Sequence, residues 1–357
     1  MLKEKPLVMI TEAVAPFFLG IDVGGTSIKI GVVDDYGRIV DIGEKDESGA
    51  PRGFRPVKTE PAPLTATQQM AKVIQDLMGK LKLQKDDIKG IGLGIPGTMD
   101  METRRLRQPP NLHSWEGYAM CDELAKITGY PVTFCNDANA AAYGEYWVGS
   151  ASGKRSIALL TLGTGIGTGI IIEGRSIDGA TGYGGECGHL LIDISENARL
   201  CGCGQRGHLE AYCSATAVAR RTIALTDIHP SSLREQITPE TRLGEIPKLV
   251  CEEAELGDPL ALQIVGDTAR FLAMGIVSIL NTVDPACVLI GGAMTFGGNE
   301  TALGQRFLDQ IRREVVSRSF KAIGEHVHID YAVLGGDAGF IGSAGLAREE
   351  YLKQASA

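Results

Sequence analysis

Two glycine-rich turns, each lying between apolar runs, constrain the fold of this chain more than any other feature of its sequence. The first turn, Gly24–Ser27, separates the runs Phe17–Val23 and Ile28–Asp34. The second, Gly163–Gly167, follows the run Ser156–Leu162 and opens the second half of the chain in the same way. Runs rich in Ile and Val on both sides of a glycine turn predict strand, turn, strand. The shared opening of the halves indicates a weak internal repeat, and two unrelated hairpins are the alternative.

Elsewhere, apolar residues alternate between short continuous runs and helical spacing. The spacing between Met70 and Leu81 predicts a helix with Thr65 or Thr67 as its N-cap, whereas Lys45–Pro63 has no period and is predicted to be a loop. Further strands are predicted at residues 38–42, 91–95, 131–135, 169–172, 287–290 and 327–334, and further helices at 117–128, 209–225, 239–255, 258–283, 302–317 and 338–353. The alternation predicts an α/β protein.

Length and composition limit the classes of protein that fit. A chain of 357 residues exceeds what one hydrophobic core usually organises, which predicts two domains. A net charge of −9 argues against a nucleic-acid partner, because such binding depends on Lys and Arg that neutralise phosphates. The chain contains no run of about 18 apolar residues, so no membrane span is predicted. Residues 1–16 have the pattern of neither a signal peptide nor a transit peptide. Eight cysteines without a secretion signal are interpreted as thiols or metal ligands, so the expected location is the cytoplasm.

Both glycine turns have the composition of phosphate-binding loops. A phosphate held by backbone N–H groups needs residues without a Cβ at the point of closest approach, and a neighbouring hydroxyl adds a donor. The candidate phosphate-binding residues are Gly24, Gly25, Thr26, Gly163, Thr164 and Gly165. Asp22 lies at the strand end before the first turn, where a carboxylate can hold the Mg²⁺ of a nucleotide. Taken alone, either turn also fits a plain hairpin.

Other nucleotide-binding classes do not fit the spacing. The chain contains no G-x-x-x-x-G-K-[ST] motif and no protein-kinase signature set. Gly92–Gly97 matches G-x-G-x-x-G after a predicted strand, but a dinucleotide site needs a helix to begin there, and Thr98–Asn111 is polar and aperiodic. This match is interpreted as incidental.

Together with further stretches, these motifs resemble those of the ROK family of bacterial sugar kinases and repressors. The segment Asp22–Lys29 looks like the family's first phosphate motif. The other matching stretches, in chain order, are Leu93–Gly97, Pro110–Leu112, Asn136–Glu145, Leu162–Ile170, Gly185–His189 and Cys201–Glu210. The resemblance extends over Phe17–Ala347, nearly the whole chain.

The resemblance implies an actin-like ATPase (ribonuclease H-like) fold, with two domains and an active-site cleft between them in which ATP and a hexose meet. On this basis the smaller domain is expected to comprise residues 17–135 together with the C-terminal helix at about 338–357. The larger domain, with a zinc loop, is expected to comprise residues 136–337.

The resemblance also implies roles for single residues. Asp137 would be the general base, and its chemistry agrees, because an alcohol needs a proton acceptor to attack a phosphoryl group. Its alternative role is the N-cap of a helix beginning there, and both can hold. The residues implied to bind sugar are Gly97, Asn111, Asn136, Asp137, Glu186, His189 and Glu210. Those implied to bind ATP, besides the residues of the two turns and Asp22, are Lys29, Gly291 and Gly292.

The spacing of histidine and cysteine near the middle of the chain predicts a structural zinc site. The four candidate ligands are His189, Cys201, Cys203 and His208, a set compatible with closed tetrahedral coordination. His208 stands where the family usually has cysteine, Cys187 and Cys213 are alternative ligands, and unmetallated thiols are the other interpretation. Zinc is expected to order the loop that carries His189 and Glu210, so its removal should affect sugar binding more than nucleotide binding.

The predicted function is therefore phosphorylation of a hexose hydroxyl by Mg-ATP, with glucose to glucose 6-phosphate as the leading reaction. The alternative substrates are N-acetylmannosamine, N-acetylglucosamine, mannose and fructose, and polyphosphate is an alternative donor. A sugar-responsive repressor is disfavoured, because 16 residues before the first strand are too few for a helix-turn-helix domain. The third hypothesis is a phosphohydrolase of the actin-like superfamily. The expected partners are hexose and ATP, with no nucleic acid and no membrane, and the family suggests a homodimer.

Overall fold

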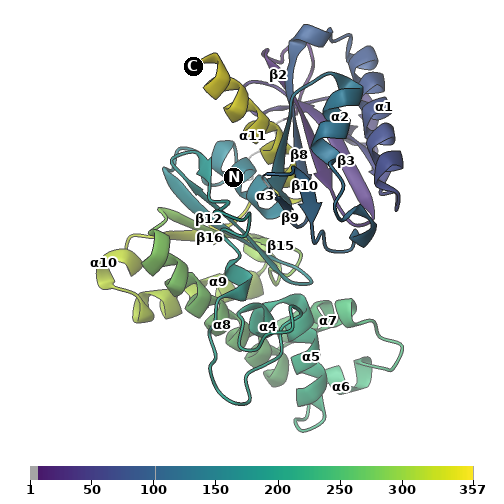
Figure 1. Cartoon of the computed structure of the whole chain (residues 1–357). Coiled ribbons are helices and arrows are strands. Elements are labelled where there is room, and N and C mark those ends of the chain that lie inside the picture. The colour runs from purple at the N-terminus through teal and green to yellow at the C-terminus, as the bar shows by residue number, and fades with distance from the viewer. Residues whose placement is uncertain (1–6, 101, 357) are drawn as a thin grey trace. The chain divides into compact units, whose positions relative to one another are not determined.

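The computed structural model describes residues 7–100 and 102–356, which form two compact units (Figure 1). The first unit comprises the chain through Gly153, the segment Gly169–Gly185 and the chain from Val333 onward. The second comprises Lys154–Thr168 and Glu186–Ala332. The expected division after Cys135 differs from this one, because helix α3 (Asp137–Trp147) packs against the C-terminal helix α11 (Ala338–Ala355) inside the first unit.

The first unit is built on a seven-stranded sheet in the order β1-β4-β3-β2-β8-β11, with β7 also paired to β3. Strands β2 and β3 form the antiparallel hairpin predicted around the first glycine turn, and β8 and β11 run parallel to β2 and to each other. The strands of this sheet are β1 (Leu7–Val8), β2 (Phe17–Val23), β3 (Ser27–Val33), β4 (Ile39–Val40), β7 (Phe54–Lys58), β8 (Ile88–Ile95) and β11 (Val132–Asn136). Two small hairpins accompany it, β5 (Glu44–Lys45) with β6 (Pro51–Arg52), and β9 (Thr98–Asp100) with β10 (Arg105–Arg107).

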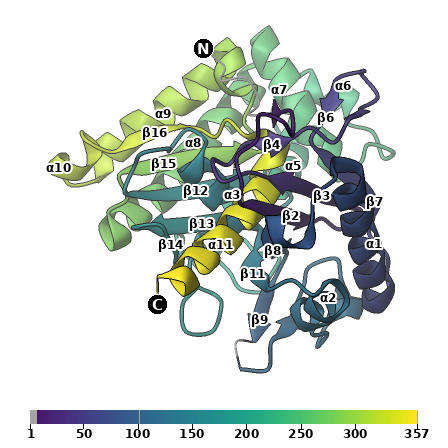
Figure 2. The ribbon, with the colours of Figure 1, turned by 90° about the horizontal axis from the view of Figure 1, so that it is seen from above.

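Helices cover both faces of this sheet. On one face, α1 (Pro63–Leu81) and α2 (Met120–Thr128) enclose the larger core of the first unit. On the other, α3 and α11 lie side by side against the strands (Figure 2). Glycines permit this contact, because a Cβ at Gly20 or Gly92 would overlap the backbone of α11, and one at Gly342 would overlap the backbone of α3. This close packing brings the N-terminal end of α11 to the ends of the central strands.

The second sheet has five strands in the order β14-β13-β12-β15-β16; β12, β15 and β16 belong to the second unit, whereas β14 and β13 from Gly169 onward belong to the first. Its strands are β12 (Ser156–Leu162), β13 (Ile166–Ile172), β14 (Arg175–Ser176), β15 (Cys287–Gly292) and β16 (His328–Tyr331). The helices of the second unit are α4 (Glu210–Cys213), α5 (Ala215–Thr226), α6 (Leu233–Gln236), α7 (Ile246–Leu256), α8 (Pro259–Val283), α9 (Ala302–Arg318) and α10 (Lys321–Gly324). The second glycine turn joins the adjacent strands β12 and β13, as predicted. The α/β class is therefore confirmed.

Several predicted elements are wrong in their bounds. Residues 54–58 form strand β7 instead of a loop, because pairing with β3 stabilises a segment that has no apolar period. The polar stretch after Gly97 forms the β9–β10 hairpin, which agrees with the absence of a dinucleotide-binding helix there. Helix α1 begins at Pro63 with Ala62 as N-cap, not at a threonine. The helix predicted at 209–225 is divided at Ser214, whose side chain caps α5.

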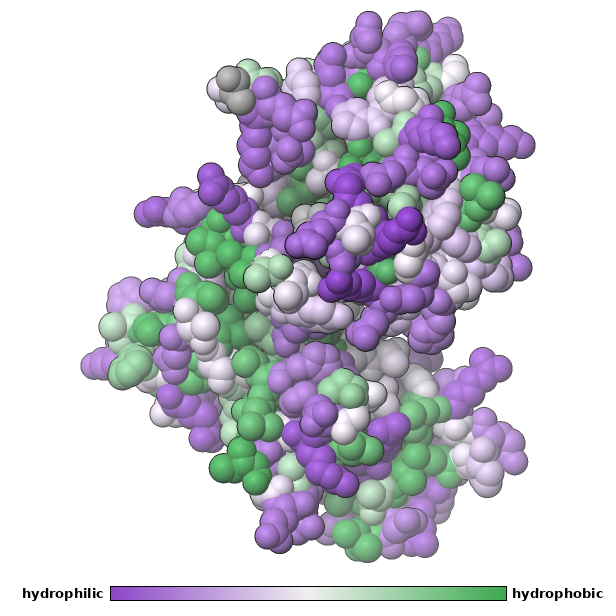
Figure 3. Space-filling model, in the orientation of Figure 1, coloured by the Kyte–Doolittle hydropathy of each residue, from purple (hydrophilic) through white to green (hydrophobic). Residues whose placement is uncertain are grey.

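Helix α8 is long and apolar enough, by length and composition alone, to cross a membrane. However, 56% of its most apolar stretch is buried inside the structure, and it contacts α4, α5, α7 and α9. The core helix of a globular domain has the same pattern, so this helix is weak evidence of a span. On the face shown in Figure 3, hydrophilic and hydrophobic residues are interspersed.

Candidate functional site

Asp22 and Lys29 face each other across the first hairpin. They are paired in the register of β2 and β3, on either side of the glycine turn. Burial raises the pKa of the Asp22 carboxyl to about 6; Lys29 opposes this shift and the negative charge of Asp137 adds to it. The structure thus brings three predicted residues, Asp22, Lys29 and Asp137, into one electrostatic group in the first unit.

A glycine-rich segment at the start of α11, which was not predicted from the sequence, completes this group. Lys29 Nζ donates a hydrogen bond to the carbonyl of Gly336 and lies 5.2 Å from the centre of the Phe54 ring. A Cβ at Gly339 would lie 2.7 Å from Asp22 Cγ. The signal in the sequence is the cluster Gly335–Gly339, but its place beside Asp22 depends on how α11 packs on the sheet.

Hydrogen bonds from Thr59 stabilise the first glycine turn. The Thr59 hydroxyl donates to the Gly24 carbonyl at 2.7 Å, its N–H donates to the Thr26 carbonyl at 3.1 Å, and Gly24 N–H donates to Ser27. On the other side, a Cβ at Gly25 would lie 3.4 Å from Asn111 Cβ. Asn111, a predicted sugar ligand, therefore lies next to the predicted phosphate turn, with a positive φ of 61°.

Asn136, not Asp137, is the N-cap of helix α3. Its side-chain oxygen accepts from Ala138 N–H at 2.9 Å and Asn139 N–H at 3.3 Å, and its Nδ2 donates to the Gly97 carbonyl at 2.9 Å. Asp137 is the first residue of the helix, and its Oδ1 accepts from Ala138 N–H at 2.9 Å. Burial raises the pKa of the Asp137 carboxyl, and the Ala138 hydrogen bond opposes the shift. Because Asn136 takes the capping role, the Asp137 carboxyl keeps lone pairs for another proton donor.

In the second unit, residues at the start of α5 hold the second glycine turn. Ala215 N–H donates to the Gly163 carbonyl at 2.8 Å, and the Thr216 hydroxyl donates to the Thr164 carbonyl at 2.7 Å. Within the part of the chain that the structure describes, the N–H groups of Thr164 and Gly165 donate to no other protein group. These N–H groups can therefore donate to an anion such as a phosphate. Thr216 was not predicted from the sequence.

Glu210 lies between this turn and the histidine–cysteine loop. Its Oε2 accepts from Ile166 N–H at 3.0 Å, and its Oε1 is 3.4 Å from Cys201 Sγ. A Cβ at Gly165 would overlap the same carboxylate, so a larger residue here would force Glu210 to move. A predicted sugar ligand is therefore also a partner of the predicted phosphate turn.

Gly291 and Gly292 lie at the end of β15, beside the end of β12. They pair in register with Thr161 and Leu162, directly before the second turn. Gly292 has a φ of 90°, and a Cβ there would overlap the Leu162 backbone. The two glycine stretches implied to bind ATP in this unit are thus neighbours at the carboxyl ends of parallel strands, where ligands commonly bind in α/β proteins.

The four predicted zinc ligands come together in the second unit. The ligand atoms of His189, Cys201, Cys203 and His208 all lie within 4.8 Å of one another. Cys201 Sγ is 3.7 Å from His189 Nδ1, and Cys203 Sγ is 3.2 Å from His208 Nδ1. Backbone hydrogen bonds shape the loop, from Cys201 N–H to the Gln205 carbonyl and from Gly204 N–H to the Cys201 carbonyl.

This donor set fits tetrahedral zinc. Bonds of about 2.3 Å to sulfur and about 2.0 Å to nitrogen place neighbouring ligand atoms about 3.3 to 3.8 Å apart, close to the spacing seen here. The alternative ligands Cys187 and Cys213 are outside the cluster that the described residues form, and Cys213 Sγ instead donates to the Leu209 carbonyl. Glu186 directly precedes the short 3₁₀ turn Cys187–His189, which carries His189 to the cluster.

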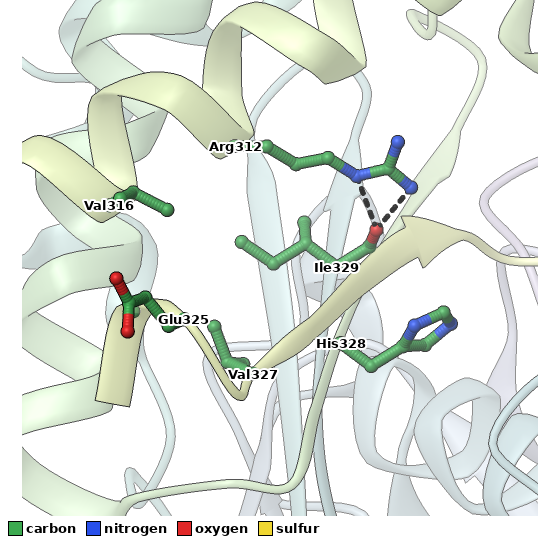
Figure 4. Close-up of a pocket in the computed structure, with 7 residues that line it drawn as sticks. Arg312, Val316, Glu325, Val327, His328 and Ile329 are labelled. Carbon is green, nitrogen blue, oxygen red and sulfur yellow. Dashed lines mark hydrogen bonds between the residues drawn. The ribbon is translucent and has the colours of Figure 1, made fainter. Parts of the chain in front are cut away.

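A separate cavity in the second unit contains none of the predicted residues. It has a volume of about 360 Å³ and lies between α9, α10 and β16 (Figure 4). Its lining residues are Arg312, Val316, Gly324, Glu325, Val327, His328 and Ile329. The Arg312 guanidinium points at the Ile329 carbonyl and donates from Nε and Nη2 at 3.0 and 2.7 Å. Its main donors are thus used by the edge strand of the sheet, and we assign no ligand to this cavity.

Comparison with known proteins places this geometry in context. The model of the ROK family matches residues 18–350. A glucokinase from Halalkalibacterium halodurans is 32% identical, over 94% of this chain and 96% of its own. A ROK hexokinase from Thermus thermophilus is 29% identical with a TM-score of 0.75, over 94% of this chain and 99% of that one. A ROK family glucokinase from Streptomyces griseus, solved with glucose and AMPPNP, is 29% identical with a TM-score of 0.67, over 93% and 99% of the two chains.

Proposed function

The chain belongs to the ROK family, and from this premise we propose that it transfers the terminal phosphoryl group of ATP to a hydroxyl of glucose. It has the actin-like ATPase fold and is a sugar kinase of the hexose-phosphorylating class. The observation that carries the proposal is the group formed by Asp22, Lys29 and Asp137 beside the first glycine turn. This group of three side chains combines a candidate base, a candidate metal ligand and a cation within one unit.

Asp137 is proposed as the general base. The sugar hydroxyl gives its proton to the Asp137 carboxylate while its oxygen bonds to the γ-phosphorus, and the bond from that phosphorus to the bridging oxygen of ADP breaks. The raised pKa of Asp137 suits this role, because a base works best when its pKa approaches the working pH. Asn136, fixed by the helix it caps and by Gly97, is proposed to orient the sugar.

The two glycine turns and Asp22 are proposed to hold Mg-ATP. Magnesium would neutralise charge on the phosphates and would be held by Asp22, directly or through water. Lys29 offers a positive charge opposite Asp22, and the N–H groups of Thr164 and Gly165 offer donors to phosphate oxygens. Gly291 and Gly292 are proposed to lie against the adenosine, next to the second turn.

Zinc is proposed to have a structural role at His189, Cys201, Cys203 and His208. The four side chains would supply all four ligands of a tetrahedral zinc ion, which would leave no open position for catalysis. Ordering this loop would fix His189 and Glu210, two of the proposed sugar ligands. The remaining sugar ligands, Gly97, Asn111 and Glu186, stay predictions, as do the homodimer and the cytoplasmic location.

The test is sugar-dependent release of ADP by the purified protein. Glucose, mannose, fructose, N-acetylglucosamine and N-acetylmannosamine are compared at equal concentration, with ATP or polyphosphate as donor. We expect the highest kcat/KM with glucose and ATP. ADP release that does not depend on any sugar would instead indicate a phosphohydrolase, and preference for an acetylated hexosamine would change the assigned substrate.

A further inference from the structure

The carboxylate of Glu145 is completely buried and is used by none of the proposed catalytic steps. It lies near the end of α3, and 0% of the residue is exposed. A buried carboxylate is costly unless its oxygens accept several hydrogen bonds. The contacts that compensate this cost therefore indicate what the residue does.

Glu145 accepts four hydrogen bonds from two distant parts of the chain. Its Oε2 accepts from the N–H and the hydroxyl of Ser150, both at 2.8 Å. Its Oε1 accepts from Val333 N–H at 2.8 Å and Leu334 N–H at 2.7 Å. These four donors are all uncharged, so the carboxylate ties two backbone segments together without forming an ion pair with them.

Those two segments are where the chain leaves the first unit and where it finally returns. The chain passes from the first unit to the second after Gly153, three residues beyond Ser150, and comes back for the last time at Val333. The first and the last of the four passages between the units are thus hydrogen-bonded to one side chain of the first unit, and the other two passages lie at Thr168–Gly169 and Gly185–Glu186. Nothing in the local sequence around Ser150 or Val333 indicates this shared partner, because the two segments are 183 residues apart.

Gly149 gives independent support for the arrangement. A Cβ at this position would overlap the Glu145 carboxylate, so only glycine lets the side chain reach Ser150. Helix α3 adds a link to the chemistry, because Asp137 begins the helix that Glu145 nearly ends. Eight residues of α-helix separate them by about 12 Å.

We propose that Glu145 is a positioning residue that anchors both passages and so controls how far the second unit closes when sugar and nucleotide bind. This inference rests on the proposed function, in which each unit supplies ligands to the substrates. Glutamate suits the role because both of its oxygens accept. Glutamine can satisfy only one of the two segments, since its NH₂ group would face the N–H of the other.

Glu145→Gln tests the proposal, with Glu350→Gln, an exposed position on α11, as the control for loss of one negative charge. The radius of gyration is measured by small-angle X-ray scattering with and without glucose and a non-hydrolysable ATP analogue. We expect these ligands to contract the wild type and the control, and to contract Glu145→Gln much less. We also expect kcat of Glu145→Gln to fall about tenfold or more, with the Kd for the ATP analogue alone within twofold of wild type.

A merely structural role predicts a different pattern, namely a lower Tm with unchanged kcat and unchanged contraction below that temperature. That result would overturn the proposal, as would a wild type that does not contract. If Glu145→Gln does not fold, Gly149→Ala, which leaves the carboxylate in place but pushes against it, is expected to show the same loss of contraction. The wild-type assay keeps the two claims separate: no turnover of any hexose refutes the proposed function, whereas normal turnover with a normally contracting variant refutes only the role of Glu145.

Discussion

The backbone N–H of Ile166 donates to the carboxylate of Glu210 at 3.0 Å, which joins the second glycine turn to the loop of the candidate metal ligands. The same carboxylate lies 3.4 Å from Cys201 Sγ. A residue expected from the family resemblance to bind sugar therefore also fixes the shape of a proposed phosphate site.

We expect Glu210→Ala to raise the KM for ATP by about tenfold, since a hydrogen bond to a charged group contributes about 1.5 to 3 kcal/mol. Glu210→Gln keeps an acceptor for Ile166 N–H and should have an ATP KM close to wild type, while both variants raise the KM for sugar. Initial rates at varied ATP and saturating sugar measure this difference. An unchanged ATP KM in Glu210→Ala would show that the turn keeps its shape without this contact.

Asp137→Asn should lower kcat by at least about a hundredfold, because asparagine cannot accept the hydroxyl proton. Asn136 still caps α3, so Tm and sugar affinity should remain near those of wild type. Steady-state rates and equilibrium sugar titration of the same preparation provide the comparison. A folded variant with nearly normal turnover would exclude Asp137 as the base.

Asp22→Asn should make the protein more heat-stable at pH 7.5 in the absence of magnesium. The pKa of Asp22 is raised to about 6 from 3.8, so the folded state binds this proton more tightly than the unfolded chain. The stability that this proton provides is present below pH 3.8 and is lost as the pH rises to about 6. The Tm difference between variant and wild type should therefore be largest above pH 6 and vanish near pH 4.

The same variant should lose the use of Mg-ATP, and Mg-ATP should raise the Tm of the wild type only. Thermal scans from pH 4 to 7.5, with and without Mg-ATP, test both statements. A Tm difference that does not change with pH would contradict the assigned titration of Asp22.

The purified protein should contain a single zinc ion per chain, bound by the four-residue cluster. His208→Cys should keep the zinc, since thiolate also binds it well, whereas Cys203→Ser should lose most of it and lower the Tm. Because Glu210 contacts both the metal loop and the second turn, we expect zinc loss to raise the KM for ATP as well as for sugar. This differs from the sequence-based expectation of a much smaller effect on nucleotide binding. Elemental analysis of protein without a histidine tag measures the metal directly, and absence of zinc from the wild type would refute the site.

Sequence-based prediction succeeded where structure depends on neighbouring residues. The glycine turn between β2 and β3, helix α8 near the predicted range 258–283, and the clustering of Cys201, Cys203 and His208 are all specified within a few residues. It failed for β7 and for the start of α1. There, pairing with β3 and the proline at the first helical turn outweighed the local period and the available threonines.

The sequence by itself determined the α/β alternation, the two glycine turns between strands and the candidate set of metal ligands, because each follows from local conformational preference or short spacing. Only the tertiary structure decided that Gly339 lies against Asp22, that Glu210 supports the second turn, and that Glu145 fastens Ser150 and Leu334 to one carboxylate. These contacts join residues tens to hundreds of positions apart. They form when helices pack against sheets at glycines. No local sequence pattern specifies which distant segment will contact a given residue.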